Sequence, residues 1–424
     1  ARLSPAVSGT SNAWIQLRNY GAEHAVIDVG SRMDFRFIYL TNLSYWRVSG
    51  LEITQFTIPF DITAGSHDII IEDCEMHHLG IPITQDAKLR VRDSYNLTIR
   101  RCQFHHIAGP GVNIAGAAHD ILIEDCDSYE NDDGRGSDGD GDGFNVDDIL
   151  TGEGALTNTW PWNITLRRCR VWNVSEDGID IKADNVLLDR CEVRNAGVNG
   201  FKLWSISNVK AVPPVGIAQT RFTVVNCLSY NSGEVGIEFQ QGPDVKLLNS
   251  TFIQTQPGLA GQGEQVILLP ANPSYNNWTG KLYSRNNVFV HLGTTPGGDS
   301  YARAMEFTRS TWQLDMDYDV FATPNYPNMC VVRWSDPQRT SLRKYTPTEV
   351  EDGTFSSLEG IEAHGRGLLP TFVDVAGGDL HLNPSDTVAR DTGQDMSASG
   401  VIEDLDGMSR PQGGSFDRGC YEHP

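Results

Sequence analysis

The sequence has no long apolar run and little positive charge. No apolar stretch approaches the roughly 18 residues that a membrane-spanning helix needs. Lys and Arg together number 33 against 55 Asp and Glu, which gives a formal net charge of −22. A chain this acidic repels the phosphates of nucleic acids, and it would need a cation to bind an acidic polymer. The composition therefore predicts neither a nucleic-acid partner nor a membrane partner.

A sustained helical pattern is also missing. No segment repeats its apolar residues with the 3.6-residue period of an amphipathic helix. Short segments alternate instead, for example at Ile69 and Ile71 and again at Ile121 and Ile123. Alternation of this kind is typical of β-strands. Because 39% of the 424 residues are hydrophobic, these strands can bury a core, and we predict an all-β protein.

The sequence is repetitive. Six segments of similar pattern, such as "HDIIIEDC" and "HDILIEDC", end at Cys74, Cys102, Cys126, Cys169, Cys191 and Cys227. Ser250 takes the next position, and the successive spacings are 28, 24, 43, 22, 36 and 23 residues. A period near 22 to 24 with insertions in some coils is that of a solenoid. We predict a right-handed parallel β-helix whose cysteines are reduced and stacked in the core.

The repeat sets the expected domain organisation. We expect one β-helix domain over residues 1–424, with clear coils at about 45–290 and decorated coils and a cap at about 291–424. The register fades after about residue 285, and the segment "DLDGMSRPQGGSFDRGCYE" is expected to cap the end of the solenoid. Because the chain opens at Ala1 without an initiator Met, we expect a processed, secreted or periplasmic protein, and a monomer.

A polar column follows the cysteines. Four residues after the cysteine, Asn173, Asn195 and Asn231 predict an asparagine ladder, and His78 and His106 occupy the same column in earlier coils. We expect these histidines to form hydrogen bonds within turns. A zinc pair at His78 and His106 is disfavoured because the sequence shows no further ligands.

A glycine column fixes a second set of aligned positions. Its members follow the cysteine by nine residues, once the loop after Cys126 is allowed for: Gly111, Gly143, Gly178, Gly200 and Gly236. The next residue of each coil is apolar and expected to point inward: Val112, Phe144, Ile179, Phe201 and Ile237. The outward column after it contains Asn113, Asn145, Asp180, Lys202 and Glu238. Equivalent residues of neighbouring coils lie about 4.8 Å apart.

Four carboxylates converge on two neighbouring coils of this alignment: Asp142, Glu176, Asp177 and Asp180. They cannot all stay ionised without a cation, because like charges oppose one another's ionisation. Oxygen ligands at variable spacing suit Ca²⁺. Solvated Asp-Gly turns or a purely structural calcium ion are the alternatives. Lys202, one coil away, favours a catalytic site, although it could instead form a surface ion pair with Asp180 or Glu238.

Two segments, "SEDGIDIK" (175–182) and "GVNGFKLW" (197–204), resemble the family 9 polysaccharide lyases, which are β-helical pectate lyases. The resemblance implies that Asp142, Glu176, Asp177 and Asp180 hold calcium and that Lys202 is the catalytic base. It also implies an acidic polysaccharide, pectate first, as the substrate. Its motifs cover roughly residues 126–204, and Glu176 stands where the family has Asp.

The implied reaction is a β-elimination, in which a base removes the proton at C5 of a uronate. We expect Lys202 to act best at alkaline pH, and Lys182, Trp204 and Glu238 to contact the substrate, with Trp204 as a platform for a sugar ring. Two alternatives stay open. A β-helical glycoside hydrolase would use a carboxylate pair such as Asp177 and Asp180. A non-catalytic carbohydrate-binding or adhesion solenoid would bind glycans and release no product.

Overall fold

The computed structural model describes residues 3–21, 23–29, 36–80, 88–132, 134, 140–147, 160–205, 220–255, 265–270, 279–293 and 302–424. The chain divides into two compact units. The first comprises residues 1–187, 195–198 and 212–218, and the second comprises residues 188–194, 199–211 and 219–424. The single domain expected over residues 1–424 stays a prediction.

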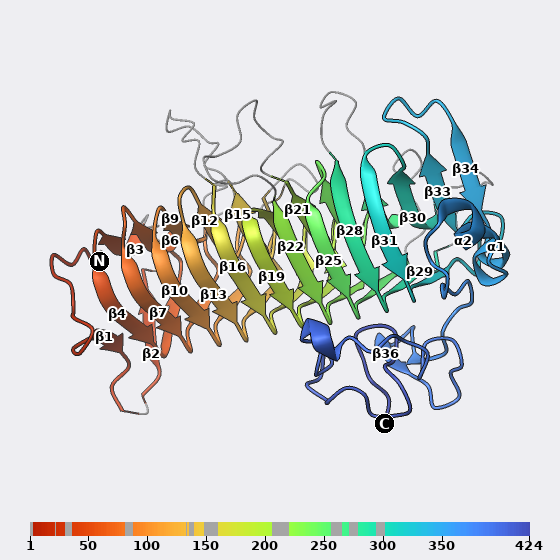
Figure 1. The fold of residues 1–424 in the computed structure, drawn as a ribbon. Helices are drawn as coiled ribbons and strands as arrows, with labels where there is room; N and C mark the ends of the chain where they lie inside the picture. Colours follow the sequence, from red (N-terminus) through yellow and green to blue (C-terminus); the bar gives the residue numbers. More distant parts are fainter. Residues whose placement is uncertain are drawn as a thin grey trace. The chain divides into compact units, whose positions relative to one another are not determined.

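The first unit is built from coils that each give one strand to three parallel sheets (Figure 1). One sheet has the order β1 (Ile15–Arg18), β4 (Ser44–Ser49), β7 (His67–Glu72), β10 (Tyr95–Arg100), β13 (His119–Glu124) and β16 (Trp162–Arg167). Another has the order β2 (Ala25–Asp28), β5 (Leu51–Thr54), β8 (Glu75–His77), β11 (Gln103–His105), β14 (Asp127–Tyr129) and β17 (Arg170–Val174). The last has the order β3 (Arg36–Thr41), β6 (Ile58–Thr63), β9 (Leu89–Arg92), β12 (Val112–Ala115), β15 (Phe144–Asp147) and β18 (Ile179–Lys182). The predicted right-handed parallel β-helix is confirmed.

Aliphatic side chains stack along the inside of these coils. Leu97 and Ile99 of β10 lie in register with Ile69 and Ile71 on one side and with Ile121 and Ile123 on the other. All six are at most 2% exposed. Burying one such side chain contributes up to about 1.5–3 kcal/mol, so the alternating pattern read in the sequence is also the main source of stability.

The cysteine column lies inside the coils, as predicted. All eight cysteines of the chain are free and buried. In the second unit the column continues with polar side chains, which accept hydrogen bonds from backbone amides of the preceding coil. Cys227 N–H donates to Ser250 Oγ at 3.1 Å, Ser250 N–H to Asn287 Oδ1 at 2.9 Å, and Asn287 N–H to Asp319 Oδ1 at 2.7 Å.

The second unit repeats the coil architecture (Figure 1). One sheet has the order β22 (Arg221–Val225), β25 (Asp244–Leu248), β28 (Gly280–Arg285) and β31 (Trp312–Asp317). Another has the order β23 (Leu228–Tyr230), β26 (Thr251–Gln254), β29 (Val288–His291) and β32 (Val320–Ala322). The last has the order β21 (Phe201–Trp204), β24 (Ile237–Gln240), β27 (Gln265–Leu269), β30 (Arg303–Thr308), β33 (Val331–Trp334) and β34 (Leu342–Tyr345). The boundaries between the units fall within β19 (Asp184–Asp189) and β20 (Glu192–Ala196). The parallel register continues to β33, beyond residue 285, where the sequence pattern fades. The cysteine alignment does not reach these coils, because Asn287 and Asp319 occupy the position that cysteine has in the earlier coils.

The carboxyl-terminal segment that we expect to form a cap packs against an outer face of the second unit, and its role as a cap stays a prediction. Its apolar residues, including Phe372, Leu380 and Tyr421, pack against Leu228 and Val288 of β23 and β29. This segment contains β35 (Phe372–Asp374), β36 (Asp379–Leu382) and the 3₁₀ turn η2 (Ser397–Ser399). The tail thus covers one outer face of the second unit.

Two short helices lie next to the last strands. They are α1 (Pro347–Glu351) and α2 (Thr354–Glu359). The ring of Phe355 in α2 lies 4.8 Å from that of Tyr345 and 6.5 Å from that of Phe321. Neither these helices nor any other helix in the described part of the chain is long and apolar enough to cross a membrane.

Candidate active site

The glycine column brings the coils of the first unit into close contact. Gly111 N–H donates to Gly143 O at 3.1 Å. A Cβ atom on Gly143 would lie 2.5 Å from Gly178 O and 2.4 Å from Cγ1 of Val171, so only glycine fits there. The register that follows is the predicted one, since Asn113 pairs with Asn145 and Asn145 with Asp180.

Three of the four predicted carboxylates meet at the start of these strands. These are Asp142, Glu176 and Asp177; each offers one carboxylate oxygen, and the three oxygens lie within 4.8 Å of one another. Asp142 and Asp177 are 3% and 1% exposed, while Glu176 is half-buried. Buried carboxylates at this separation repel one another, and a hard divalent cation such as Ca²⁺ is the natural counter-charge.

Both oxygens of Asp142 are held by hydrogen bonds. Oδ1 accepts from the backbone N–H of Asp177 at 3.0 Å, and Oδ2 accepts from Nδ2 of Asn145 at 3.0 Å. Asn145 in turn accepts from Nδ2 of Asn113 at 2.7 Å. Each carboxylate oxygen has a second lone pair, so these bonds orient Asp142 without using up its capacity to bind a cation. The sequence alignment places Asn113 and Asn145 in the column of Asp180 but predicts no role for them.

The environment of Asp142 disfavours its ionised form. Burial raises the pKa of this carboxyl well above its usual range, and the negative charges of Asp177, Asp180 and Glu176 raise it further. The hydrogen bond from Asn145 opposes the shift. Either a proton on Asp142 or a cation bound at the cluster relieves this repulsion between carboxylates.

Asp180 lies beside the trio and is paired with a lysine. Lys182 Nζ is 3.3 Å from Asp180 Oδ2 and 2.7 Å from Asp147 Oδ2. Asp180 is 5% exposed, and its charge is one of those that raise the pKa of Asp142. Lys182 therefore has a structural partner in the cluster, in addition to the substrate contact that stays a prediction. Asp147 was missed, although it follows Asn145 by the two residues that keep it on the same face.

Lys202, Trp204 and Glu238 come together in the second unit. Lys202 in β21 pairs in register with Glu238 in β24, as predicted. Its Nζ lies 5.7 Å from the centre of the Trp204 ring, and Glu238 is buried. A lysine over a tryptophan face at this distance is a cation–π contact. The position of Lys202 beside the carboxylates stays a prediction.

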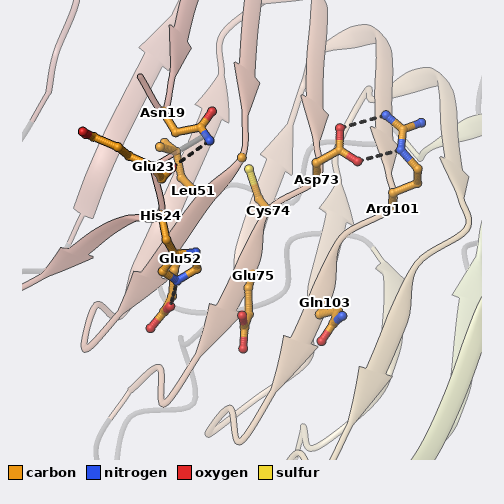
Figure 2. Close-up of a pocket in the computed structure, with 11 residues that line it drawn as sticks. Asn19, Glu23, His24, Leu51, Glu52, Asp73, Cys74, Glu75, Arg101 and Gln103 are labelled. Carbon is orange, nitrogen blue, oxygen red and sulfur yellow. Dashed lines mark hydrogen bonds and ion pairs between the residues drawn. The ribbon is translucent and has the colours of Figure 1, made fainter. Parts of the chain in front are cut away.

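A pocket elsewhere in the first unit contains none of the predicted site residues. It has a volume of about 440 Å³ and is lined by Asn19, Glu23, His24, Gly50, Leu51, Glu52, Asp73, Cys74, Glu75, Arg101 and Gln103. Figure 2 shows Asp73 and Arg101 joined by two hydrogen bonds, of 2.6 and 2.9 Å, at one side of it. Glu52 and Glu75 point into the same region from successive coils.

Several solved structures are similar to this chain. Pectate lyase Pel9A is 15% identical, with 100% of this chain and 83% of that chain covered at a TM-score of 0.48. A rhamnogalacturonan lyase is 16% identical, with 73% and 70% covered at a TM-score of 0.41. The catalytic unit of a GH87 α-1,3-glucanase from Streptomyces thermodiastaticus strain HF3-3 is 11% identical, with 81% and 63% covered at a TM-score of 0.45. No curated protein sequence matches the chain.

One protein-family model also matches this chain. The model described as the right-handed β-helix region matches residues 37–212 and 156–291, which together make up more than half of the sequence. The matched residues include the cysteine column, the glycine column and the carboxylate cluster. The chain therefore belongs to the right-handed β-helix family.

Proposed function

We propose that this protein is a secreted, monomeric polysaccharide lyase that cleaves an acidic polyuronate, with pectate as the first candidate, by calcium-assisted β-elimination. The observation that carries the proposal is the trio Asp142, Glu176 and Asp177, whose ligand oxygens lie within 4.8 Å of one another at largely buried positions. The resemblance of the segments 175–182 and 197–204 to family 9 polysaccharide lyases supports it, and membership of that family is part of the proposal.

The donor set fits calcium. It consists of carboxylate oxygens, the ligands that Ca²⁺ prefers, and Asp142 is already oriented by two hydrogen bonds. Asp142, Glu176 and Asp177 would hold the ion, with Asp180 as a fourth ligand. Calcium bound there would neutralise the substrate's C6 carboxylate and stabilise negative charge on the enolate-like intermediate.

Lys202 is the proposed base. In the sequence alignment, Gly178 and Gly200 occupy equivalent positions of consecutive coils, and Asp180 and Lys202 each follow their glycine by two residues. The alignment therefore predicts that Asp180 and Lys202 share one outward column. The lone pair of the neutral Lys202 Nζ takes the C5 proton, the C5–H electrons form the C4–C5 double bond, and the C4–O bond breaks to release the sugar. Because lysine ordinarily has a pKa of ~10.4, this role favours alkaline pH. Trp204, Glu238 and Lys182 are proposed substrate contacts.

A glycoside hydrolase is the second candidate. The buried carboxylates Asp177 and Asp180 would supply its acid and its base or nucleophile, and burial raises the pKa of Asp142 in the same cluster. A hydrolase adds water across the glycosidic bond and leaves no double bond in the product. The ultraviolet absorbance of an unsaturated uronide therefore separates the two reactions.

Calcium binding is the first test of this proposal. Isothermal titration of the purified protein with Ca²⁺ should show a site that Asp142→Asn loses and that the control Asp127→Asn keeps. Asp127 is a suitable control because it lies in the same unit and is paired with Arg170. Activity should then be screened on polygalacturonate, alginate and glycosaminoglycans, with calcium or with a chelator. A protein that binds no calcium, or one that binds these glycans without releasing product, would contradict the proposal.

A further inference from the structure

Two pairs of adjacent histidines stack on successive coils of the first unit, and we call His77, His78, His105 and His106 the histidine patch. His77 ends β8 and His105 ends β11. The rings of His77 and His105 lie 5.1 Å apart, those of His78 and His106 lie 4.9 Å apart, and both pairs of rings are nearly parallel. The sequence placed only His78 and His106 in one column. The structure adds a second imidazole beside each of them.

Within each coil the two imidazoles meet through the same atom. Nδ1 of His105 lies 2.8 Å from Nδ1 of His106, and Nδ1 of His77 lies 2.6 Å from Nδ1 of His78. Contact between two nitrogens at this distance is favourable only if one of them carries a proton or if both bind a shared cation.

The outer nitrogens of the His105–His106 pair are already engaged. Nε2 of His105 lies 3.0 Å from Oε1 of Glu75, and Nε2 of His106 lies 3.0 Å from Oε2 of Glu130. An ionised carboxylate only accepts hydrogen bonds, so both Nε2 atoms must be the donors. A neutral imidazole has a single N–H, which leaves a lone pair on each Nδ1. When both rings are neutral, two lone pairs therefore face each other at 2.8 Å, an arrangement that a cation relieves.

We infer that Nδ1 of His105 and Nδ1 of His106 form a binding site for a divalent transition-metal ion of the Ni²⁺ or Cu²⁺ type. With metal–nitrogen bonds of about 2.1 Å, a separation of 2.8 Å corresponds to an angle near 90° at the metal, as in tetragonal sites, whereas tetrahedral zinc needs about 3.4 Å. The carboxylates on Nε2 are the partners that metal-binding histidines commonly have, because they fix the tautomer and the ring orientation.

The surroundings favour a cation at this position. Glu75 lines the pocket of Figure 2, as does Glu52, whose Oε1 lies 3.1 Å from Nε2 of His77. The histidine patch therefore adjoins a solvent-open pocket and has three glutamates, Glu52, Glu75 and Glu130, as its direct partners. His106 is exposed, so water molecules can complete the coordination of the ion.

Nickel binding tests the inference. The full chain is titrated with Ni²⁺ in saturating Ca²⁺, so that calcium occupies the carboxylate cluster, and binding is followed by calorimetry and by the melting temperature. We expect one Ni²⁺ site in the wild type, and an affinity lower by about tenfold or more in His106→Ala. His119→Ala is the matched control, since Nδ1 of His119 is 2.8 Å from Asp120 and its ring stacks between Tyr95 and Trp162.

The control should bind Ni²⁺ as the wild type does, and Ni²⁺ should raise the melting temperature of the control but not that of His106→Ala. If His106→Ala melts early without metal, His106→Gln repeats the test with a longer side chain. No Ni²⁺ uptake by the wild type, or equal affinity in the wild type and the His106 variants, overturns the inference, and the pair then shares a proton. Equal losses in the His119 and His106 variants also overturn it.

Discussion

The backbone N–H of Asp177 donates a hydrogen bond to Oδ1 of Asp142 at 3.0 Å, although 35 residues separate the two in the sequence. This bond joins two coils at the point where their acidic residues meet. Its length depends on the close approach of the coils that the glycine column permits. The candidate site is thus held by the ladder of the β-helix.

Replacing Gly143 with alanine should therefore damage the site through the backbone. The new Cβ would overlap Gly178 O and the Val171 side chain, and overpacking of this kind costs about 1–3 kcal/mol of unfolding free energy. We expect a lower denaturant midpoint and weaker calcium binding. Gly414→Ala is the control, because its Cβ would have 3.7 Å to the nearest atom. Equal denaturant midpoints for Gly143→Ala and Gly414→Ala would contradict this prediction, because they would show that the coils move apart without loss of unfolding free energy.

The stability of the calcium-free protein should fall as pH rises. The pKa of Asp142 is raised in the folded state, so between the unfolded pKa and this higher value the folded protein holds a proton that the unfolded chain has lost. Above that window the ionised carboxylate destabilises the fold. Asp142→Asn, which cannot ionise, should therefore melt higher than the wild type at pH 8 in chelator and gain nothing from calcium. A wild-type melting temperature that rises over this range in chelator would speak against a strained Asp142.

Lys182 should compete with calcium for Asp180. Its Nζ lies 3.3 Å from Oδ2 of Asp180, so Lys182→Met removes a positive charge from the edge of the cluster. We expect calcium to bind about two- to fivefold more tightly, as for loss of an ion pair worth up to ~1 kcal/mol. The exposed Lys246 supplies the control variant, Lys246→Met. Calorimetry that finds weaker binding in Lys182→Met would instead indicate that Lys182 supports the site.

The thiols should be unreactive in the native protein. All eight cysteines are free and buried, and burial raises the pKa of the Cys102, Cys126 and Cys227 thiols, which keeps them protonated. A thiol reagent should label none of them under native conditions and all eight after denaturation without reductant. Fewer than eight labelled thiols would reveal a disulfide and contradict the stacking of the column.

The coil architecture could be predicted because each coil repeats the same requirements. Cysteine fits the inward corner, glycine fits where the next coil's carbonyl approaches, and the residue after it is apolar. These constraints gave the register of Asn113, Asn145 and Asp180 without a structure. The cysteine pattern does not identify the later coils, because Asn287 and Asp319 occupy the corner position there. Their side chains accept hydrogen bonds from backbone amides at this position.

Other features depend on contacts that spacing does not encode. The outer face of the second unit becomes apolar at Leu228 and Val288, where earlier coils have Gln103 and Asp127, and this change was a readable signal that the tail covers that face. The pairing of Lys182 with Asp147 follows from their shared face, but its geometry depends on side-chain rotamers. The same holds for the Nδ1 contact between His105 and His106.

Elimination by Lys202 is the central claim, and its most direct measurement is the ultraviolet absorbance of the unsaturated product on polygalacturonate, in calcium and in chelator. We predict a steady rise for the wild type in calcium, faster at alkaline pH, and none in chelator. Lys202→Ala should lower the rate by about 10² to 10⁴, and Lys202→Arg by nearly as much, because a guanidinium stays protonated. Lys246→Ala should keep the wild-type rate, and unchanged melting temperatures would show that the variants are folded. Wild-type absorbance growth in folded Lys202→Ala, or new reducing ends without any absorbance, would contradict the account.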